Sequence, residues 1–373
     1  MDWWVSMPKV ELHAHLNGSI RNSTLLELAG ELGEKGTINF SDVEHVILKH
    51  DRSLREVFKL FDLIHIITTD HKIVTRITEE VVEDFAAENV VYLELRTTPK
   101  CALVHKRNDS IGMSKQSYME AVVEGLRAVS TVEVDFGSHD LSTPADSSAI
   151  SDKGNGSQRK KIHVRLLLSI DRRETTTAAM ETVELALEMR HLGVVGIDLS
   201  GNPTIGEWAT FLPALKFARE QGLSITLHCG EVPNPEEIQA MLSFLPGRIG
   251  HACCFEEDEW SKLKSSKIPV EICLTSNLRT ETIPSIDVHH FADLYNSKHP
   301  ILLCTDDSGV FSTSLSNEYS LASSSFGLGK AEMFQLARDA IGFIFANDVV
   351  KEELVKIFAS AARNLDSWPQ SCT

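Results

Sequence analysis

The chain has 373 residues, of which 42% are hydrophobic and 24% are charged; this is the composition of a globular enzyme and excludes a disordered protein. No run approaches the roughly 18 apolar residues of a membrane-spanning helix, and the first residues lack the basic and apolar regions of a secretory signal. The formal net charge of −17 argues against a nucleic-acid partner, because phosphate backbones are bound through basic surfaces. We therefore expect a cytosolic protein with no membrane or nucleic-acid partner, whose seven cysteines are reduced.

Eight short runs rich in apolar and β-branched residues alternate with longer amphipathic segments along the chain. These runs are 9–13, 90–96, 163–170, 194–199, 224–228, 248–251, 269–274 and 300–305. Such alternation is typical of a parallel sheet covered by helices, and eight units predict a (β/α)8 TIM barrel that forms one domain over residues 1–373. An open doubly wound sheet is the alternative, and the absence of a G-x-G-x-x-G motif after the first run disfavours it.

Two segments depart from this alternation. Residues 22–89 contain several amphipathic stretches between the first two runs, which predicts a helical insertion after the first strand. From about 136 to 160 the chain is rich in Gly, Ser, Asp and Asn and offers little to bury, which predicts a mobile surface loop. We expect the protein to be a monomer.

The first run ends in His13-Ala14-His15. Residues two apart in an extended chain point to the same face, so both imidazoles can reach one ion. Such a pair alone is more often a buried hydrogen-bonded pair than a metal site. Later runs end in His228 and Asp306, however, and the C-terminal ends of barrel strands meet on one face. Three imidazoles and one carboxylate suit a single Zn²⁺ with a coordination position left for water.

Three further polar residues follow these strand ends and are candidates for acid–base catalysis. Glu231 lies three residues beyond His228 and can hand a proton to a substrate. His251 and Asp307 can orient an attacking water or accept its proton. Each also has an ordinary structural interpretation: Glu231 as a rim residue, His251 as a core histidine and Asp307 as a helix cap.

These motifs, H-x-H, H-x-G-E, G-H and T-D-D, resemble those of the adenosine deaminase family in the same order over nearly the whole chain. The resemblance implies a mononuclear zinc barrel in which water attacks C6 of an aminopurine and the amine leaves. It assigns the protonation of ring N1 to Glu231, the positioning of the water to His251 and Asp307, and a backbone contact with the purine to Gly201. Ala252 departs from the family pattern, which usually has a second glycine there.

Segments 95–100, 169–173, 230–234 and 273–277 resemble the adenosine deaminase-like branch of this family. Members of that branch hydrolyse N6-methyl-AMP and related N6-substituted purine nucleoside monophosphates to IMP and the free amine. Adenosine deaminases have an aspartate near the ribose 5′ end where this chain has Asn17. A carboxylate there would repel a 5′-phosphate, whereas a neutral amide can donate a hydrogen bond to it.

The remaining substrate contacts follow from the same resemblance. The expected set is His15, Asn17, His65, Thr97, Thr98, Pro99, Lys100, Asp171, Gly201, Glu231 and Asp307. Lys100 has the alternative of a solvated rim charge, His65 of an amphipathic helix face and Asp171 of a salt bridge to Arg172 or another basic group. Two other functions stay open, deamination of free adenosine and nucleotide binding without catalysis; the intact ligand set and Glu231 disfavour the second.

Overall fold

The computed structural model describes residues 2–36, 38–49, 54–68, 70–100, 113–137 and 159–363. Within these ranges one sheet contains nine strands, and all of their pairings are parallel. The strands are β1 (Lys9–His15), β2 (Val90–Thr97), β3 (Glu133–Asp135), β4 (Lys161–Asp171), β5 (Val194–Ser200), β6 (Ser224–Cys229), β7 (Arg248–His251), β8 (Val270–Ile272) and β9 (Ile301–Leu303). They are ordered β1-β2-β4-β5-β6-β7-β8-β9, and β3 pairs with the start of β4.

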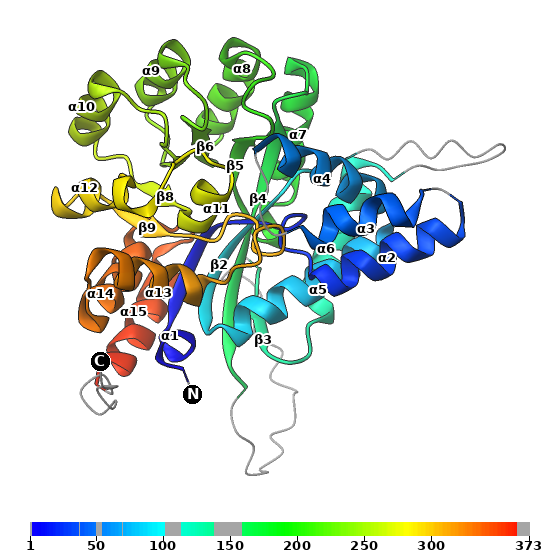
Figure 1. Ribbon diagram of the computed structural model, residues 1–373, viewed down its shortest axis with the longest axis horizontal. Coiled ribbons are helices and arrows are strands. Elements are labelled where there is room, and N and C mark those ends of the chain that lie inside the picture. The colour runs from blue at the N-terminus through cyan, green and yellow to red at the C-terminus, as the bar shows by residue number, and fades with distance from the viewer. Residues whose placement is uncertain are drawn as a thin grey trace.

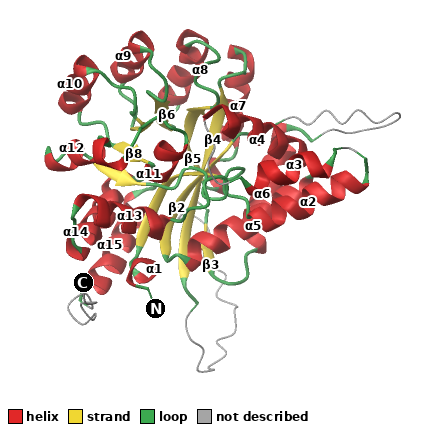
Figure 2. Cartoon of the chain, in the orientation of Figure 1, coloured by secondary structure: helices red, strands yellow, loops and turns green. Residues whose placement is uncertain are grey.

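The sheet curls into a nearly closed barrel, with its strands at the centre of the molecule and helices around them (Figure 2). Closure occurs where the chain beyond β9 meets β1. The backbone N–H of Asp306 donates to the carbonyl of His13 at 2.8 Å, and the N–H of His15 donates to the carbonyl of Asp306 at 3.0 Å. The predicted TIM barrel is confirmed, and the doubly wound alternative is wrong because its first and last strands would not meet.

The helices surround the barrel (Figure 1). They are α1 (Trp3–Ser6), α2 (Asn22–Glu34), α3 (Phe40–Leu48), α4 (Leu54–Ile67), α5 (His71–Ala87), α6 (Lys115–Ala128), α7 (Thr176–Glu188), α8 (Trp208–Glu220), α9 (Pro235–Phe244), α10 (Glu257–Ser266), α11 (Leu274–Arg279), α12 (Phe291–Asn296), α13 (Leu315–Phe326), α14 (Lys330–Asp339) and α15 (Asp348–Ala362). The predicted insertion consists of α2 to α5, which lie together on the right of the barrel in Figure 1.

Every predicted run contains a strand, and each end agrees to within two residues. The largest difference in kind is at β8, where the predicted run continues into Leu274, the first residue of α11. The short strand β3 was not predicted, since its three residues are half-exposed or exposed and lack an apolar pattern. The predicted loop at 136–160 lies mostly outside the described residues. No helix in the described ranges is both long and apolar enough to cross a membrane.

Candidate active site

Four side chains from three segments converge at the C-terminal ends of the strands. The Nε2 atoms of His13 and His15 on β1 each lie 3.1 Å from Nε2 of His228 on β6. Both β1 atoms also lie 3.4 Å from Oδ1 of Asp306, just beyond β9. Ligand atoms about 2.1 Å from a tetrahedral ion lie about 3.4 Å apart, so this arrangement fits a single metal ion. The four residues predicted as ligands are therefore brought together by the fold.

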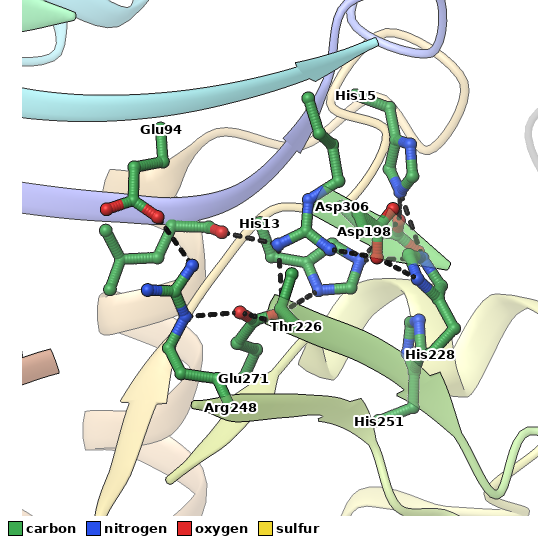
Figure 3. Close-up of polar contacts among 12 residues, drawn as sticks. His13, His15, Glu94, Asp198, Thr226, His228, Arg248, His251, Glu271 and Asp306 are labelled. Atoms are coloured by element: carbon green, nitrogen blue, oxygen red, sulfur yellow. Dashed lines mark hydrogen bonds and ion pairs between the residues drawn. The ribbon is translucent and has the colours of Figure 1, made fainter. Parts of the chain in front are cut away.

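The hydrogen bonds on the far side of two imidazoles support a cation between them (Figure 3). His13 donates from Nδ1 to Oε2 of Glu271 at 2.6 Å, and His228 donates from Nδ1 to Oδ1 of Asp198 at 3.0 Å. A neutral imidazole has one proton, so each Nε2 presents a lone pair toward the other. Two lone pairs facing each other across 3.1 Å repel unless a positive ion lies between them.

Asp306 is held in an orientation that leaves one oxygen for the ion. Its Oδ2 accepts a hydrogen bond from the Ser276 hydroxyl at 2.7 Å, so Oδ1 faces the histidines. The preceding residue, Thr305, donates from its N–H and its hydroxyl to Oε2 of Glu11 on β1, both at 2.9 Å. Glu11 thus ties together the two chain segments on which His13 and Asp306 lie.

The backbone at two strand ends is strained. Asp306 has a φ of 62°, His251 a φ of 67° and Ala252 a φ of 55°, all in the left-handed region that L residues rarely adopt. Such strain costs on the order of 1–3 kcal/mol per residue and is concentrated at functional sites. The conformation of Ala252 explains why a glycine is usual at this position: glycine adopts a positive φ without a steric penalty.

Beneath the metal ligands lies a fully buried network of ion pairs. The carboxylate of Glu271 accepts from four groups: His13, Arg96 at 2.9 Å, Arg248 at 2.6 Å and the Thr226 hydroxyl at 2.9 Å. Arg248 also pairs with Glu94 at 2.5 Å (Figure 3). Arg96 pairs with Asp198 at 3.3 Å. Buried charges are stable only when paired, so this network fixes the orientation of the carboxylates that hold the ligand imidazoles.

A cavity opens above the ligands, and the three predicted acid–base residues line it. Nε2 of His251 lies 3.9 Å from Oε1 of Glu231. Nε2 of His251 and Oδ1 of Asp307 have no hydrogen-bond partner within the described ranges, although both are buried. Gly18 makes room for Asp307, because a Cβ at Gly18 would lie 1.6 Å from that Oδ1. These groups are therefore available to a bound substrate and water.

The electrostatics of the cavity distinguish its carboxyl groups. Burial raises the pKa of Glu231 to about 7, against a usual value near 4.3. Burial also raises the pKa of Asp307, and the neighbouring charge of Asp306 raises it further. Glu231 can thus hold a proton near neutral pH and give it to a bound base.

Besides Arg96, two cations line the same cavity. The ammonium of Lys100 donates to Nε2 of His65, and burial lowers the pKa of Lys100 to about 8 and that of His65 to about 3. The other cation is Arg173, which pairs with Asp171 at 2.7 Å. Asp171 therefore forms a salt bridge, as the alternative interpretation predicted, and its partner is Arg173. Arg172 pairs instead with Glu237 at 2.7 Å.

Asn17, His15, Thr98 and Gly201 also line the cavity, as the sequence predicts, whereas Pro99 is buried and does not. Thr97 reaches the cavity, but its hydroxyl lies 2.7 Å from the hydroxyl of Tyr118, which donates to Oδ1 of Asn17 at 3.1 Å. The hydroxyl of Thr97 therefore donates to Tyr118. The NH₂ group of Asn17 is the part of the amide that remains available to a ligand.

Sequence reasoning missed the residues that support the site. They are Glu11, Glu94, Arg96, Tyr118, Asp198, Arg248, Glu271, Ser276 and Asn277. One available signal was the occurrence of charged residues inside otherwise apolar strand runs, as at Glu271 between Val270 and Ile272. Because both faces of a parallel strand are buried, such a residue must have a buried partner.

A comparison with protein-family models agrees with this geometry. The model described as adenosine deaminase matches residues 8–360, which is most of the chain. The chain belongs to the adenosine deaminase family. Within this family it is 70% identical over 362 residues to the N6-mAMP deaminase of Arabidopsis thaliana, an alignment that covers 97% of this chain and 99% of that protein. It is 38% identical over 366 residues to the human N6-methyl-AMP deaminase, covering 95% and 93% of the two chains.

Solved structures of similar proteins have the same fold. A crystal structure of Arabidopsis ADAL complexed with IMP superposes with a TM-score of 0.88 at 68% identity, covering 98% of this chain and 99% of that one. A second structure of the Arabidopsis protein, complexed with GMP, has a TM-score of 0.87 at 69% identity and covers 97% and 99%. The family member described here therefore has relatives that bind purine nucleoside monophosphates.

Proposed function

We propose that this deaminase hydrolyses N6-methyl-AMP, and related N6-substituted purine nucleoside monophosphates, to IMP and the free amine. The observation that supports this most directly is that one cavity is lined both by members of the four-residue His/Asp cluster and by the cations Lys100 and Arg173. A nucleotide needs both sets: a base near the metal and a phosphate near the cations. The 70% identity to the Arabidopsis N6-mAMP deaminase supports the same assignment.

We propose zinc as the ion, held by His13, His15, His228 and Asp306. The support is chemical: three neutral imidazoles and one carboxylate oxygen are the donors that zinc prefers at a catalytic site. When bound, zinc supplies Lewis acidity that makes a water molecule acidic enough to attack at neutral pH.

The protein groups then manage the protons. We assign Asp307 to accept the proton of the attacking water, because its buried Oδ1 lacks a partner within the described ranges. Glu231 protonates N1 of the purine, which draws electron density away from C6 as the water adds there. His251 orients the water, and the backbone at Gly201 contacts the base. Asp307 returns its proton to N6 as the C6–N6 bond breaks, the C6 hydroxyl gives its proton to Glu231 as the carbonyl forms, and the products are the neutral amine and the base of IMP.

We assign the 5′-phosphate to Asn17, Lys100, His65 and Thr98, which all line the cavity. Lys100 offers a charge-assisted hydrogen bond, and the NH₂ group of Asn17 offers a neutral donor. A substrate panel tests the proposal against its rivals. We expect kcat/KM to be highest for N6-methyl-AMP, lower for AMP and lowest for adenosine. Preference for adenosine would favour a nucleoside deaminase. Absence of amine release from any of them, by protein with stoichiometric zinc, would favour a binding protein.

The Asn17→Asp substitution should penalise phosphorylated substrates selectively. The aspartate can still accept from Tyr118, but it places a negative charge where the amide donor faces the cavity. Two like charges about 4 Å apart repel by a few kcal/mol near a protein surface, so we expect kcat/KM for N6-methyl-AMP to fall at least about tenfold. The control is Tyr118→Phe, which removes the hydrogen bond that holds Asn17 without adding charge and should affect nucleoside and nucleotide equally. An equal effect of Asn17→Asp on both substrates would contradict a phosphate site.

The Lys100→Met substitution should also lower kcat/KM for the nucleotide substrate and not for the nucleoside. It keeps most of the aliphatic stem and removes the ammonium, and a hydrogen bond to a charged group contributes about 1.5–3 kcal/mol. We expect kcat/KM for N6-methyl-AMP to fall about 10- to 100-fold, with little change for N6-methyladenosine. Lys72→Met on the exposed face of α5 removes the same charge outside the cavity and should change neither value. A loss of similar size for N6-methyladenosine would show that Lys100 does not contact the phosphate.

We further propose that the protein is a cytosolic monomer. The odd number of cysteines without a C-x-x-C pair supports a reducing compartment. Cell fractionation tests the location, and sedimentation of the purified protein tests the oligomeric state.

A further inference from the structure

A line of buried hydrogen bonds leads from the backbone of α12 to His251. It begins at the N–H of Phe291, which donates to Nδ1 of His289 at 3.1 Å. A backbone N–H can only donate, so Nδ1 of His289 has no proton. The imidazole then has its proton on Nε2, which lies 3.2 Å from Oδ1 of Asn277.

This first step fixes the direction of the following ones. Because Nε2 of His289 donates, the group of Asn277 that faces it must be the carbonyl oxygen. The NH₂ group of the same amide therefore faces His251, where Nδ2 lies 3.1 Å from Nδ1 of the imidazole. An NH₂ group can only donate, so Nδ1 of His251 is an acceptor without a proton.

We infer that Asn277 and His289 are positioning residues that fix the tautomer of His251, so that His251 presents its Nε2–H as a donor to the cavity. Nε2 is the atom that faces the cavity without a partner within the described ranges. Asn277 and His289 are each 2% exposed, and His251 is 3% exposed, so water does not compete for these bonds. Nδ1 of each ring accepts a hydrogen bond from a group that can only donate, so each ring has its proton on Nε2.

The fixed tautomer divides the work between the two groups that face the attacking water. A donor at Nε2 can bond a lone pair of the water oxygen and orient it, but it cannot remove a proton. Removal of the proton is therefore left to another group. The proposed function assigns it to Asp307, whose buried Oδ1 has no partner within the described ranges. This division of roles rests on the proposed deaminase function, whereas the tautomer itself follows from the hydrogen bonds alone.

The tautomer can be measured without turnover. ¹⁵N NMR of the zinc-loaded enzyme labelled in histidine distinguishes protonated from bare ring nitrogens, and a His251→Gln variant identifies the signals of His251. We expect Nε2 of His251 to be protonated and Nδ1 to be bare. The opposite pattern in the unsubstituted enzyme would overturn the inference, whatever the substrate proves to be.

Two substitutions of Asn277 test the consequence. Asn277→Asp is nearly isosteric but offers only acceptors, so we expect the proton of His251 to move to Nδ1 and kcat to fall about 100-fold or more, as for a histidine held in the wrong tautomer. Asn277→Leu removes the hydrogen bond to Nδ1 of His251 without offering an acceptor there, so it should lower kcat less than Asn277→Asp does. KM and zinc content should stay close to those of the unsubstituted enzyme in Asn277→Asp, whereas the unfolding midpoint should fall because the variant buries an unpaired carboxylate.

The order of these effects decides between positioning and packing. Loss of kcat in the order Asn277→Asp, then Asn277→Leu, with the moved proton seen only in the aspartate variant, supports the inference. Equal losses in both variants, or an unchanged tautomer in Asn277→Asp, would show that Asn277 only fills space. If the unsubstituted enzyme shows the expected tautomer yet turns over none of the purines, the proposed function fails and the hydrogen-bond line stands.

Discussion

Replacing Glu231 with glutamine should lower kcat by about 100- to 10,000-fold, the usual contribution of a positioned acid or base. The amide has the same shape as the carboxylic acid but cannot deliver a proton to N1 of the purine. Burial raises the pKa of Glu231 to about 7, so the native side chain can supply that proton near neutral pH. Stopped-flow or steady-state release of the amine from N6-methyl-AMP measures the loss.

Zinc content and binding of the product IMP should be retained in this variant, because Glu231 is not one of the four clustered ligands. Glu207→Gln is the matched control, since Glu207 is exposed and its side chain caps nothing at the start of α8. A kcat near that of the unsubstituted enzyme would remove the role assigned to Glu231.

The second large effect is expected on stability. In Glu271→Gln, one carboxylate oxygen becomes an NH₂ group that faces donors, because all four groups around Glu271 donate to it. Removing one partner of a buried ion pair costs about 3–5 kcal/mol, since the opposite charge stays buried. We expect a loss of this size in the free energy of unfolding, measured by chemical denaturation of zinc-free protein.

The same substitution should weaken zinc binding by about 10- to 100-fold, because Glu271 orients the ring of His13. Competition with a chelator measures this change. Glu318→Gln is the matched control: Glu318 is also fully buried, but among the described residues it accepts only from the N–H of Thr275 and the hydroxyl of Thr313. Its loss of stability should be clearly smaller, and equal losses would show that the charge network adds nothing beyond ordinary hydrogen bonds.

Much of the site could be predicted because it depends on local periodicity and on one general property of barrels. Residues two positions apart on a strand point to the same face of the sheet, which places His13 beside His15. Strand ends meet on one face of a barrel, which brings His228 and Asp306 to the same place. The eight strands themselves were found from their apolar runs. The direct ligands and the acid–base groups could thus be named before any coordinates.

The supporting residues could not be named in this way, because their partners depend on strand register. Glu271 lies opposite Gly250 in the pairing of β7 with β8. The ring of His13 fits against Gly250, where a Cβ would lie 2.7 Å from its Cε1, and so reaches Glu271. His13 and Glu271 are 258 positions apart in the sequence, and no spacing rule relates them. Only the register of the closed sheet brings them together.

By itself, then, the sequence determined the barrel, the four His and Asp residues that cluster at the strand ends, and three further polar residues that line the cavity beside them. Each of these depends on where a residue lies along its own strand. The tertiary structure decided which ring nitrogen carries the proton in His13, His228 and His251. That choice depends on Glu271, Asp198 and Asn277, which lie on other strands and helices. A histidine or an asparagine can donate or accept a hydrogen bond, and only its partners in the folded protein decide which it does.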